Sequence, residues 1–197
     1  MIKKIMMTLA LLGLMGCGAC SANLKSELDS SNPTIDKNTW ETWDTCSQNV
    51  GDHPCDFTLK DQDGKDVSLY DFYGKTIVLD FSTGWCAYCQ VAAQEVQHVQ
   101  DLYGESDFAY ITILVETATG TDPGQSDVSD WADNFGIESA PVLAGSRDLI
   151  SSDASLGWPV SGWPTFYFIN DDMEINTYLK GFSSTMIIDL IEDTKNN

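Results

Sequence analysis

Residues Thr76–Cys89 read TIVLDFSTGWCAYC, and this stretch decides the fold. Its first half is a β-branched, apolar run of the kind typical of a buried strand. From Val91 to Tyr103, apolar residues recur every three to four positions, which predicts one apolar stripe along a helix, and Gly104 suits the C-cap of that helix. The motif Cys86-Ala87-Tyr88-Cys89 therefore lies where a strand ends and a helix begins.

This position favours an ionised thiol at the first cysteine of the motif. The first turn of a helix presents unpaired N–H groups and the positive end of the helix dipole. A thiolate at Cys86 should be stabilised there, and only the thiolate attacks a disulfide. Cys89, three residues further along, is expected to be more buried and to resolve the mixed disulfide. A single C-x-x-C is also half of a zinc site, but the chain beyond Asn38 has no second one, so we expect no metal site and no cofactor.

The segment from Val78 to Cys89 resembles the active-site segment of the thioredoxin superfamily, in which an Asp stands six residues before the first Cys, as Asp80 does here. The resemblance implies that Asp80 is buried beneath the cysteines with a raised pKa and shuttles a proton to and from Cys89. Desolvation acts in that direction, because burial disfavours a carboxylate and makes it a better base near neutral pH. The alternative is a solvated Asp at a strand end.

A second segment, Ser161–Ile169, reads SGWPTFYFI and resembles the G-x-P-T segment of the superfamily. The resemblance implies a cis peptide bond before Pro164 and a backbone that faces the C-x-x-C motif, where a substrate chain pairs with it like an added strand. The alternative is an ordinary trans-Pro that opens a strand. Trp163 departs from the small or β-branched residue that usually precedes this Pro. Our candidate substrate-binding residues are Trp85, Trp163, Pro164 and Thr165.

The order of the remaining elements predicts one α/β domain. Turn residues separate short apolar runs within residues 56–69 and 166–179, which predicts two hairpins. The layout resembles the TlpA-like envelope branch of the thioredoxin superfamily over about residues 46–195, which implies a three-layer sandwich with a central mixed sheet flanked by helices. Residues 138–159 exceed what a bare thioredoxin needs and are expected to add a strand or a loop over the active site. Trp158 and Trp163 are candidates for a hydrophobic substrate surface, although at least one is expected to pack in the interior.

The first residues have the layout of a secretory signal peptide. Lys3 and Lys4 precede an apolar run, Ile5–Met15, that is too short to span a membrane. The run leads into Leu14-Met15-Gly16-Cys17, which resembles a bacterial lipobox, so Cys17 is expected to carry a lipid; Cys20 is a weaker alternative. We therefore predict a signal peptide at 1–16, a lipid-anchored flexible tether at 17–38 and a thioredoxin-like domain at 39–197. The predicted location is extracytoplasmic, in a bacterial cell envelope, on the periplasmic side if the host is Gram-negative.

Two further cysteines, Cys46 and Cys55, bracket a short loop that contains Gly51 and Pro54. In an oxidising compartment this spacing predicts a structural disulfide. The alternative is a pair that exchanges electrons with another dithiol.

Composition narrows the classes of function. The chain of 197 residues carries 30 acidic and 10 basic residues, a formal net charge of −20. A surface of this sign repels phosphate backbones, so no nucleic-acid partner is expected. The 43% of hydrophobic residues is enough for a packed core, which excludes wholesale disorder.

These features predict a membrane-anchored thiol-disulfide oxidoreductase that reduces or exchanges disulfides of envelope proteins through the Cys86–Cys89 pair. Its partners would be protein dithiol or disulfide substrates and a thiol protein that donates or accepts electrons. One alternative is a peroxiredoxin-like peroxide reductase, because Thr83-x-x-Cys86 matches part of that signature; however, Leu79 stands where the family has Pro, and the only Arg, Arg147, is far from Cys86 in sequence. The other is a copper chaperone or scaffold with a thioredoxin fold, although the copper proteins of this superfamily use C-x-x-x-C, a spacing one residue longer.

Overall fold

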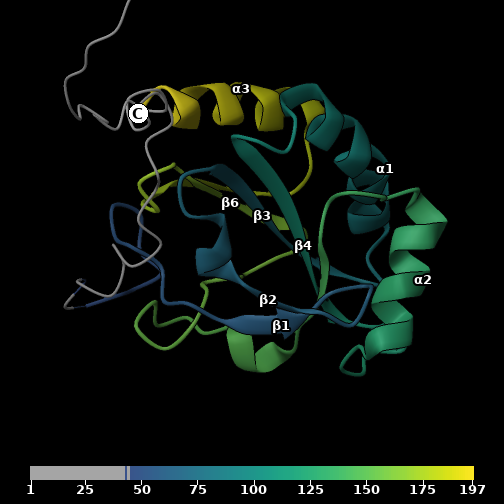
Figure 1. Cartoon of the computed structure of the whole chain (residues 1–197). Coiled ribbons are helices and arrows are strands. Elements are labelled where there is room, and N and C mark those ends of the chain that lie inside the picture. Colours follow the sequence, from purple (N-terminus) through teal and green to yellow (C-terminus); the bar gives the residue numbers. More distant parts are fainter. Residues whose placement is uncertain (1–42, 44) are drawn as a thin grey trace, which may run out of the picture. The chain divides into compact units, whose positions relative to one another are not determined.

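The computed structural model describes residue 43 and residues 45–197, so Cys17, the predicted signal peptide and the predicted tether lie outside the described residues. A five-stranded mixed sheet forms its centre, with strand order β5-β4-β3-β6-β7 (Figure 1). Three strands are parallel to one another: β3 (Thr76–Thr83), β4 (Phe108–Glu116) and β5 (Val142–Ala144). Two complete the sheet in an antiparallel manner: β6 (Thr165–Ile169) beside β3, and β7 (Ile175–Lys180) beside β6. The predicted α/β class with a central mixed sheet is confirmed.

Three helices pack on one face of this sheet: α1 (Ala87–Tyr103), α2 (Gln125–Phe135) and α3 (Ser184–Lys195). Their apolar stripes share one core cluster with strand residues such as Val78 and Phe166. For α1 and α2 the right-handed rule for parallel crossovers accounts for this, because β3-α1-β4 and β4-α2-β5 advance across the sheet in the same direction and so carry their helices to the same side.

A hairpin, two 3₁₀ helices and a long loop cover the opposite face. The hairpin consists of β1 (Thr58–Lys60) and β2 (Asp66–Ser68), and the 3₁₀ helices are η2 (Leu69–Phe72) and η3 (Arg147–Leu149). Trp158 fills the core of this layer at 2% exposure, with its ring 5.3 Å from that of Phe81 and 4.8 Å from that of Tyr167. Trp158 is therefore a packing residue. Residues 138–159 supply the edge strand β5 and part of this covering loop.

The alternation of side chains along β3 decides which residues reach the site. Leu79 and Phe81 point into the layer of the hairpin and the long loop, whereas Val78 points toward the helices. Because successive side chains of a strand alternate between the two faces, Asp80 and Ser82 also lie on the helix side, under α1.

The Cys46–Cys55 loop lies at the other end of the sheet. The two cysteines are joined by a disulfide, and the loop between them forms two backbone hydrogen bonds with Ile175: Gly51 N donates to its oxygen at 2.8 Å, and its N–H donates to Asp52 O at 3.0 Å. Ile175 pairs with Ile169, at the end of β6 that is remote from Thr165. The loop is thereby tied to the sheet end farthest from the start of α1.

Candidate functional site

Cys86 is the N-cap residue of α1. Its Sγ accepts a hydrogen bond from the backbone N–H of Cys89 at 3.4 Å, and both cysteines are free thiols. Cys86 is 8% exposed and Cys89 is completely buried. A sulfur in this position faces the N–H groups of the first turn and the positive end of the helix dipole. The outer cysteine is thus arranged for nucleophilic attack, and the inner one is kept from solvent.

A buried carboxyl group lies on the same side of β3 as the helix that carries the cysteines. Asp80 is 1% exposed, and burial raises its pKa to about 7 even though a hydrogen bond from Ser82 Oγ, at 2.8 Å, acts in the opposite direction. Burial also raises the pKa of Cys89, and the negative charge of Asp80 raises it further. We name Asp80, Ser82 and Cys89 the floor of the site. The floor holds a thiol that resists ionisation next to a carboxyl group that changes protonation near neutral pH, which is the pairing needed for proton transfer.

Two hydroxyl residues at the floor, one of its members and one neighbour, went unrecognised in the sequence. Ser82 is the donor to Asp80, and Thr112 stands beside Asp80 in the parallel β3–β4 register, on the same face as Tyr110 and Leu114. The hydroxyl of Thr112 is buried and has no hydrogen-bond partner among the described residues. The only signal for either residue was a hydroxyl side chain within a predominantly buried strand.

The second predicted segment lies at the same end of the sheet. The Trp163–Pro164 peptide bond is cis, and Thr165 opens β6 opposite Phe81. Thr165 is only 1% exposed, and its hydroxyl donates to Gly162 O at 2.8 Å, so its side chain holds the turn from within. Of the four predicted substrate-binding residues, Trp85 and Trp163 are the two whose side chains reach the surface next to each other.

An ion pair that sequence reasoning missed holds these two tryptophans. Trp85 Nε1 donates to Glu116 Oε2 at 2.7 Å, and the other oxygen of Glu116 is paired with the guanidinium of Arg147. That guanidinium lies 5.8 Å from the ring centre of Trp163, and the two indole rings meet edge to face at 6.4 Å. We name Trp85, Glu116, Arg147 and Trp163 the rim of the site. Arg147 is thus beside the C-x-x-C loop in space, although it is 61 positions from Cys86 in the sequence.

The carboxylate of Glu116 is the centre of the rim. It is 8% exposed, and the hydrogen bond from Arg147 holds its pKa below the ordinary value against the opposing effect of desolvation. A bulge in the β3–β4 register brings Glu116 opposite Thr83, three residues before Cys86. The one signal in the sequence was an acidic residue closing an otherwise apolar nine-residue strand.

Two features that the described residues lack bear on other kinds of site. They contain no group of three or more His, Cys, Asp or Glu side chains arranged to hold a metal ion. In that same part of the chain, no helix is both long and apolar enough to cross a membrane.

Comparison with known proteins places this geometry in a family. The model of the AhpC/TSA family matches residues 50–178. The chain is 24% identical over 144 residues to the thiol-disulfide oxidoreductase ResA of Halalkalibacterium halodurans, which covers 73% of this chain and 76% of that protein. With ResA of Oceanobacillus iheyensis the identity is 30% over 136 residues, 67% of this chain and 65% of that one. Among solved structures, the exposed lipoprotein thioredoxin of Streptococcus pneumoniae has the same fold, with a TM-score of 0.58 and 24% identity over 71% of this chain and 99% of that one.

Proposed function

The chain belongs to the AhpC/TSA family, and we propose that it is a thiol-disulfide oxidoreductase that acts on proteins through Cys86 and Cys89. One observation carries the proposal: Cys86 Sγ caps the helix that begins at the C-x-x-C motif, above a buried Cys89 and a buried Asp80. The relatives named thiol-disulfide oxidoreductase support the same chemistry.

The reaction consists of two exchanges. The thiolate of Cys86 attacks one sulfur of a substrate disulfide, which forms a mixed disulfide and releases the first substrate thiolate. Cys89 then loses its proton and attacks Cys86 Sγ, which releases the second substrate thiolate and leaves a Cys86–Cys89 disulfide. The substrate gains two electrons and the protein loses two, so a dithiol donor must reduce the protein again. Run in reverse, the same steps oxidise a substrate dithiol.

Asp80 is the proposed proton acceptor for Cys89. The thiol of Cys89 needs a base because its own pKa is raised, and Asp80 is ionised in half of the molecules when the pH equals its pKa of about 7. We expect Asp80→Asn to slow the second exchange about a hundredfold, the lower end of the range for general acid–base catalysis, and to leave the first exchange almost unchanged. Rapid-mixing measurements of the formation and decay of the mixed disulfide separate the two steps.

The rim and the cis-Pro turn are the proposed contact area for the substrate. Trp85 and Trp163 give apolar walls beside Cys86, and the backbone before Pro164 offers a strand edge to an extended chain. By analogy with the TlpA-like branch that the layout resembles, we favour reduction of substrates over oxidation, with another thiol protein as electron donor.

The peroxide-reductase alternative has weaker support. The side chain of Thr83 is fully buried, and its hydroxyl has no partner in the described part of the chain. Arg147 is near the site, but Glu116 pairs with it. A peroxide consumption assay decides the matter: consumption by wild type at rates that exceed its disulfide exchange would replace our proposal.

The envelope location is a second part of the proposal. It rests on the apolar run before Cys17 and on the lipobox-like quartet that ends there. We propose that Cys17 is acylated after removal of residues 1–16 and that the protein works on the extracytoplasmic side of a membrane. Expression in a bacterial host, followed by mass spectrometry of the mature N-terminus, tests this. Cys17→Ala should move the protein from the membrane fraction to the aqueous fraction.

Trapping tests the proposed function directly. Cys89→Ser removes the resolving thiol, so a substrate protein should remain bound to Cys86 as a disulfide that a reductant releases. Cys86→Ser is the matched control and should retain no substrate. Absence of any trapped protein, together with inability of the wild type to reduce a model disulfide, would refute the proposal.

A further inference from the structure

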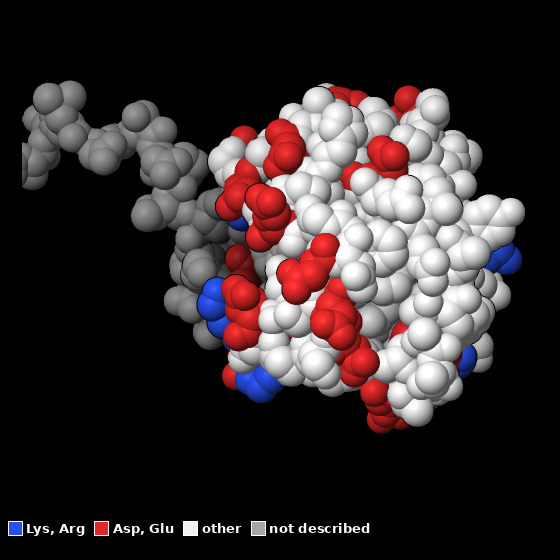
Figure 2. Space-filling view, turned by 90° about the vertical axis from the view of Figure 1, so that its right-hand side faces the viewer, with Lys and Arg blue, Asp and Glu red and all other residues white. Residues whose placement is uncertain are grey.

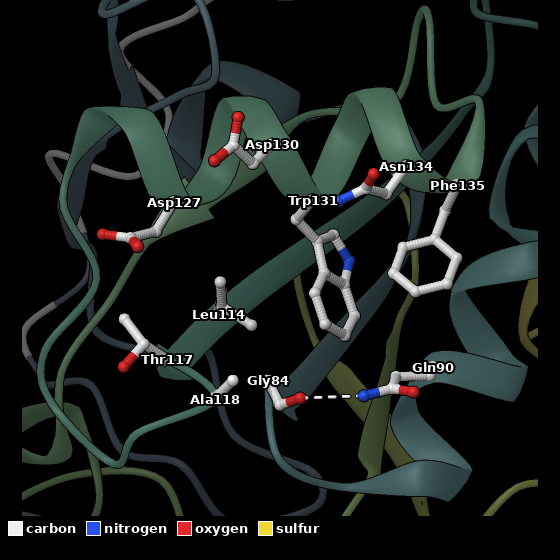
Figure 3. A pocket seen from close by; sticks show the side chains of 10 residues that line it. All are labelled: Gly84, Gln90, Leu114, Thr117, Ala118, Asp127, Asp130, Trp131, Asn134 and Phe135. Atoms are coloured by element: carbon white, nitrogen blue, oxygen red, sulfur yellow. Dashed lines mark hydrogen bonds between the residues drawn. The ribbon is translucent and has the colours of Figure 1, made fainter.

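A cavity of about 350 Å³ lies beside the C-x-x-C loop, between α2 and the end of β4 (Figure 3). Gly84, two residues before Cys86, and Gln90, one residue after Cys89, form its wall nearest the site. Gln90 Nε2 donates to Gly84 O at 2.9 Å and closes that wall. A group bound in this cavity therefore sits next to the reacting cysteines, on the side away from Pro164.

The inner wall is aromatic and contains an unused donor. Figure 3 shows the indole of Trp131 extending from α2 toward Gly84 and Gln90, with the ring of Phe135 beside it. Trp131 is 7% exposed, and its Nε1–H has no acceptor among the described residues. A buried donor without a partner is unfavourable, which points to an acceptor that arrives with a ligand.

The outer edge of the cavity is acidic. Asp127 and Asp130 line it, both from α2. Neither α1 nor α2 contains a Lys or Arg residue. Figure 2 shows this side of the molecule, where Asp and Glu side chains are spread over the surface and Lys and Arg appear only near its margins. An incoming cation is attracted here both by the two carboxylates and by the field of the whole chain.

We propose that this cavity is a subsite for an arginine side chain that a substrate protein carries close to its reactive cysteine pair. The inference rests on the proposed function and names the class of substrate. The guanidinium stacks on the Trp131 and Phe135 wall and faces Asp127 and Asp130, and a carbonyl of the same bound segment accepts from Trp131 Nε1. A planar guanidinium suits an aromatic wall with carboxylates at its edge better than the compact ammonium of lysine does.

Peptides with one internal disulfide test the subsite. A set of peptides places Arg, Lys, Gln or Glu at each position that flanks the disulfide, and the second-order rate constant for reduction by the dithiol protein is measured for each. At low ionic strength we expect the best Arg peptide to react about fivefold faster than its Gln counterpart, with Lys in between and Glu slowest. In concentrated salt the advantage should shrink, because screening weakens exposed charges.

Two variants of α2 form a matched pair. Asp130→Asn should lower the ratio of the Arg to the Gln rate constant toward one, whereas Asp133→Asn, on the same helix but outside the cavity lining, should keep the wild-type ratio. Because each ratio is taken within one variant, a general change in reactivity cancels. Trp131→Phe keeps an aromatic ring but removes the donor, and it should slow all peptides while leaving the ratio high.

The outcomes separate the two levels of proposal. Equal rate constants for the Arg and Gln peptides in the wild type, or equal ratios in Asp130→Asn and Asp133→Asn, would overturn the subsite and leave the oxidoreductase intact. Failure of the wild type to reduce any peptide would instead overturn the proposed function itself.

Discussion

The described part of the chain contains two cysteine pairs in opposite surroundings. Cys46 and Cys55 are closed into a disulfide in a surface loop at one end of the sheet, and Cys46 is exposed. Cys86 and Cys89 are free thiols at the start of α1, at the other end, and both are buried. The first pair has no helix start and no buried carboxyl group beside it, whereas the second has both.

This difference shows that the sequence spacing of two cysteines does not by itself make them a redox-active pair. A thiolate needs donors to stabilise it, a resolving thiol needs a base, and both need a surface on which a partner can lie. The helix start, the floor and the rim supply these three things to Cys86 and Cys89. We therefore expect the two pairs to respond in different ways to the same substitution.

The largest contrast is expected in disulfide exchange. Cys86→Ser should lower the rate of substrate reduction by at least about a thousandfold, because a hydroxyl is a far weaker nucleophile than a thiolate. The double variant Cys46→Ser with Cys55→Ser should retain the wild-type rate. Steady-state reduction of a protein disulfide measures both, with circular dichroism to verify folding. A comparable loss in the double variant would make the Cys46–Cys55 pair part of the redox path and end the contrast.

The second effect concerns Asp80, the buried carboxyl group that lies beside Cys86 and Cys89. Among the described residues, the Cys46–Cys55 pair has no counterpart to it. Asp80 has a pKa of about 7 in the folded protein against 3.8 for an ordinary Asp carboxyl group, so the folded state binds the proton more tightly than the unfolded state. Its contribution to stability is therefore lost as the pH rises from about 4 to about 7, by about 4 kcal/mol in total. Asp80→Asn should remove this dependence and be more stable than the wild type at pH 8. Urea unfolding at several pH values measures the difference, and parallel curves for the two proteins would contradict the buried, proton-binding Asp80.

The contrast between the two pairs also marks what could be predicted from the sequence. The strand and helix around Cys86 were predictable because apolar periodicity is a local property, and Asp80 stood out as a charge in an apolar strand. Glu116 and Arg147 were not, because a bulge in the β3–β4 register and the turn at η3 bring them to Trp85 and Trp163, respectively, from distant parts of the chain. Their positions depend on tertiary packing, which no short window of sequence contains. The way in which the hairpin, the 3₁₀ helices and the long loop cover the second face was hidden for the same reason.

The third effect should appear in stability and not in exchange. Removal of the Cys46–Cys55 disulfide should lower the free energy of unfolding by about 2–3 kcal/mol, because the open loop of the unfolded chain regains conformational entropy. Urea unfolding of the double Ser variant measures this loss, and wild type treated with a reductant gives the matched reference. The same double Ser substitution of Cys86 and Cys89, which form no disulfide in the dithiol state, should cost less. A larger loss from the second pair would reverse the structural and redox roles.

The smallest effect is expected at the rim, which only the redox pair has. Glu116→Gln keeps an acceptor for Trp85 Nε1 but loses the ion pair with Arg147. Because an ion pair with a solvent-exposed arginine is weak, we expect the KM for a protein disulfide to rise only about fivefold while kcat stays the same. A small disulfide that does not touch the two tryptophans should be reduced at the wild-type rate, which a general loss of structure would not permit. Glu138→Gln, an exposed substitution of the same type, is the control and should change neither constant. If kcat fell and KM stayed constant, Glu116 would act on the reacting sulfur atoms. The rim would then take part in the reaction and not only in substrate binding, so the division of roles between the floor and the rim would be wrong.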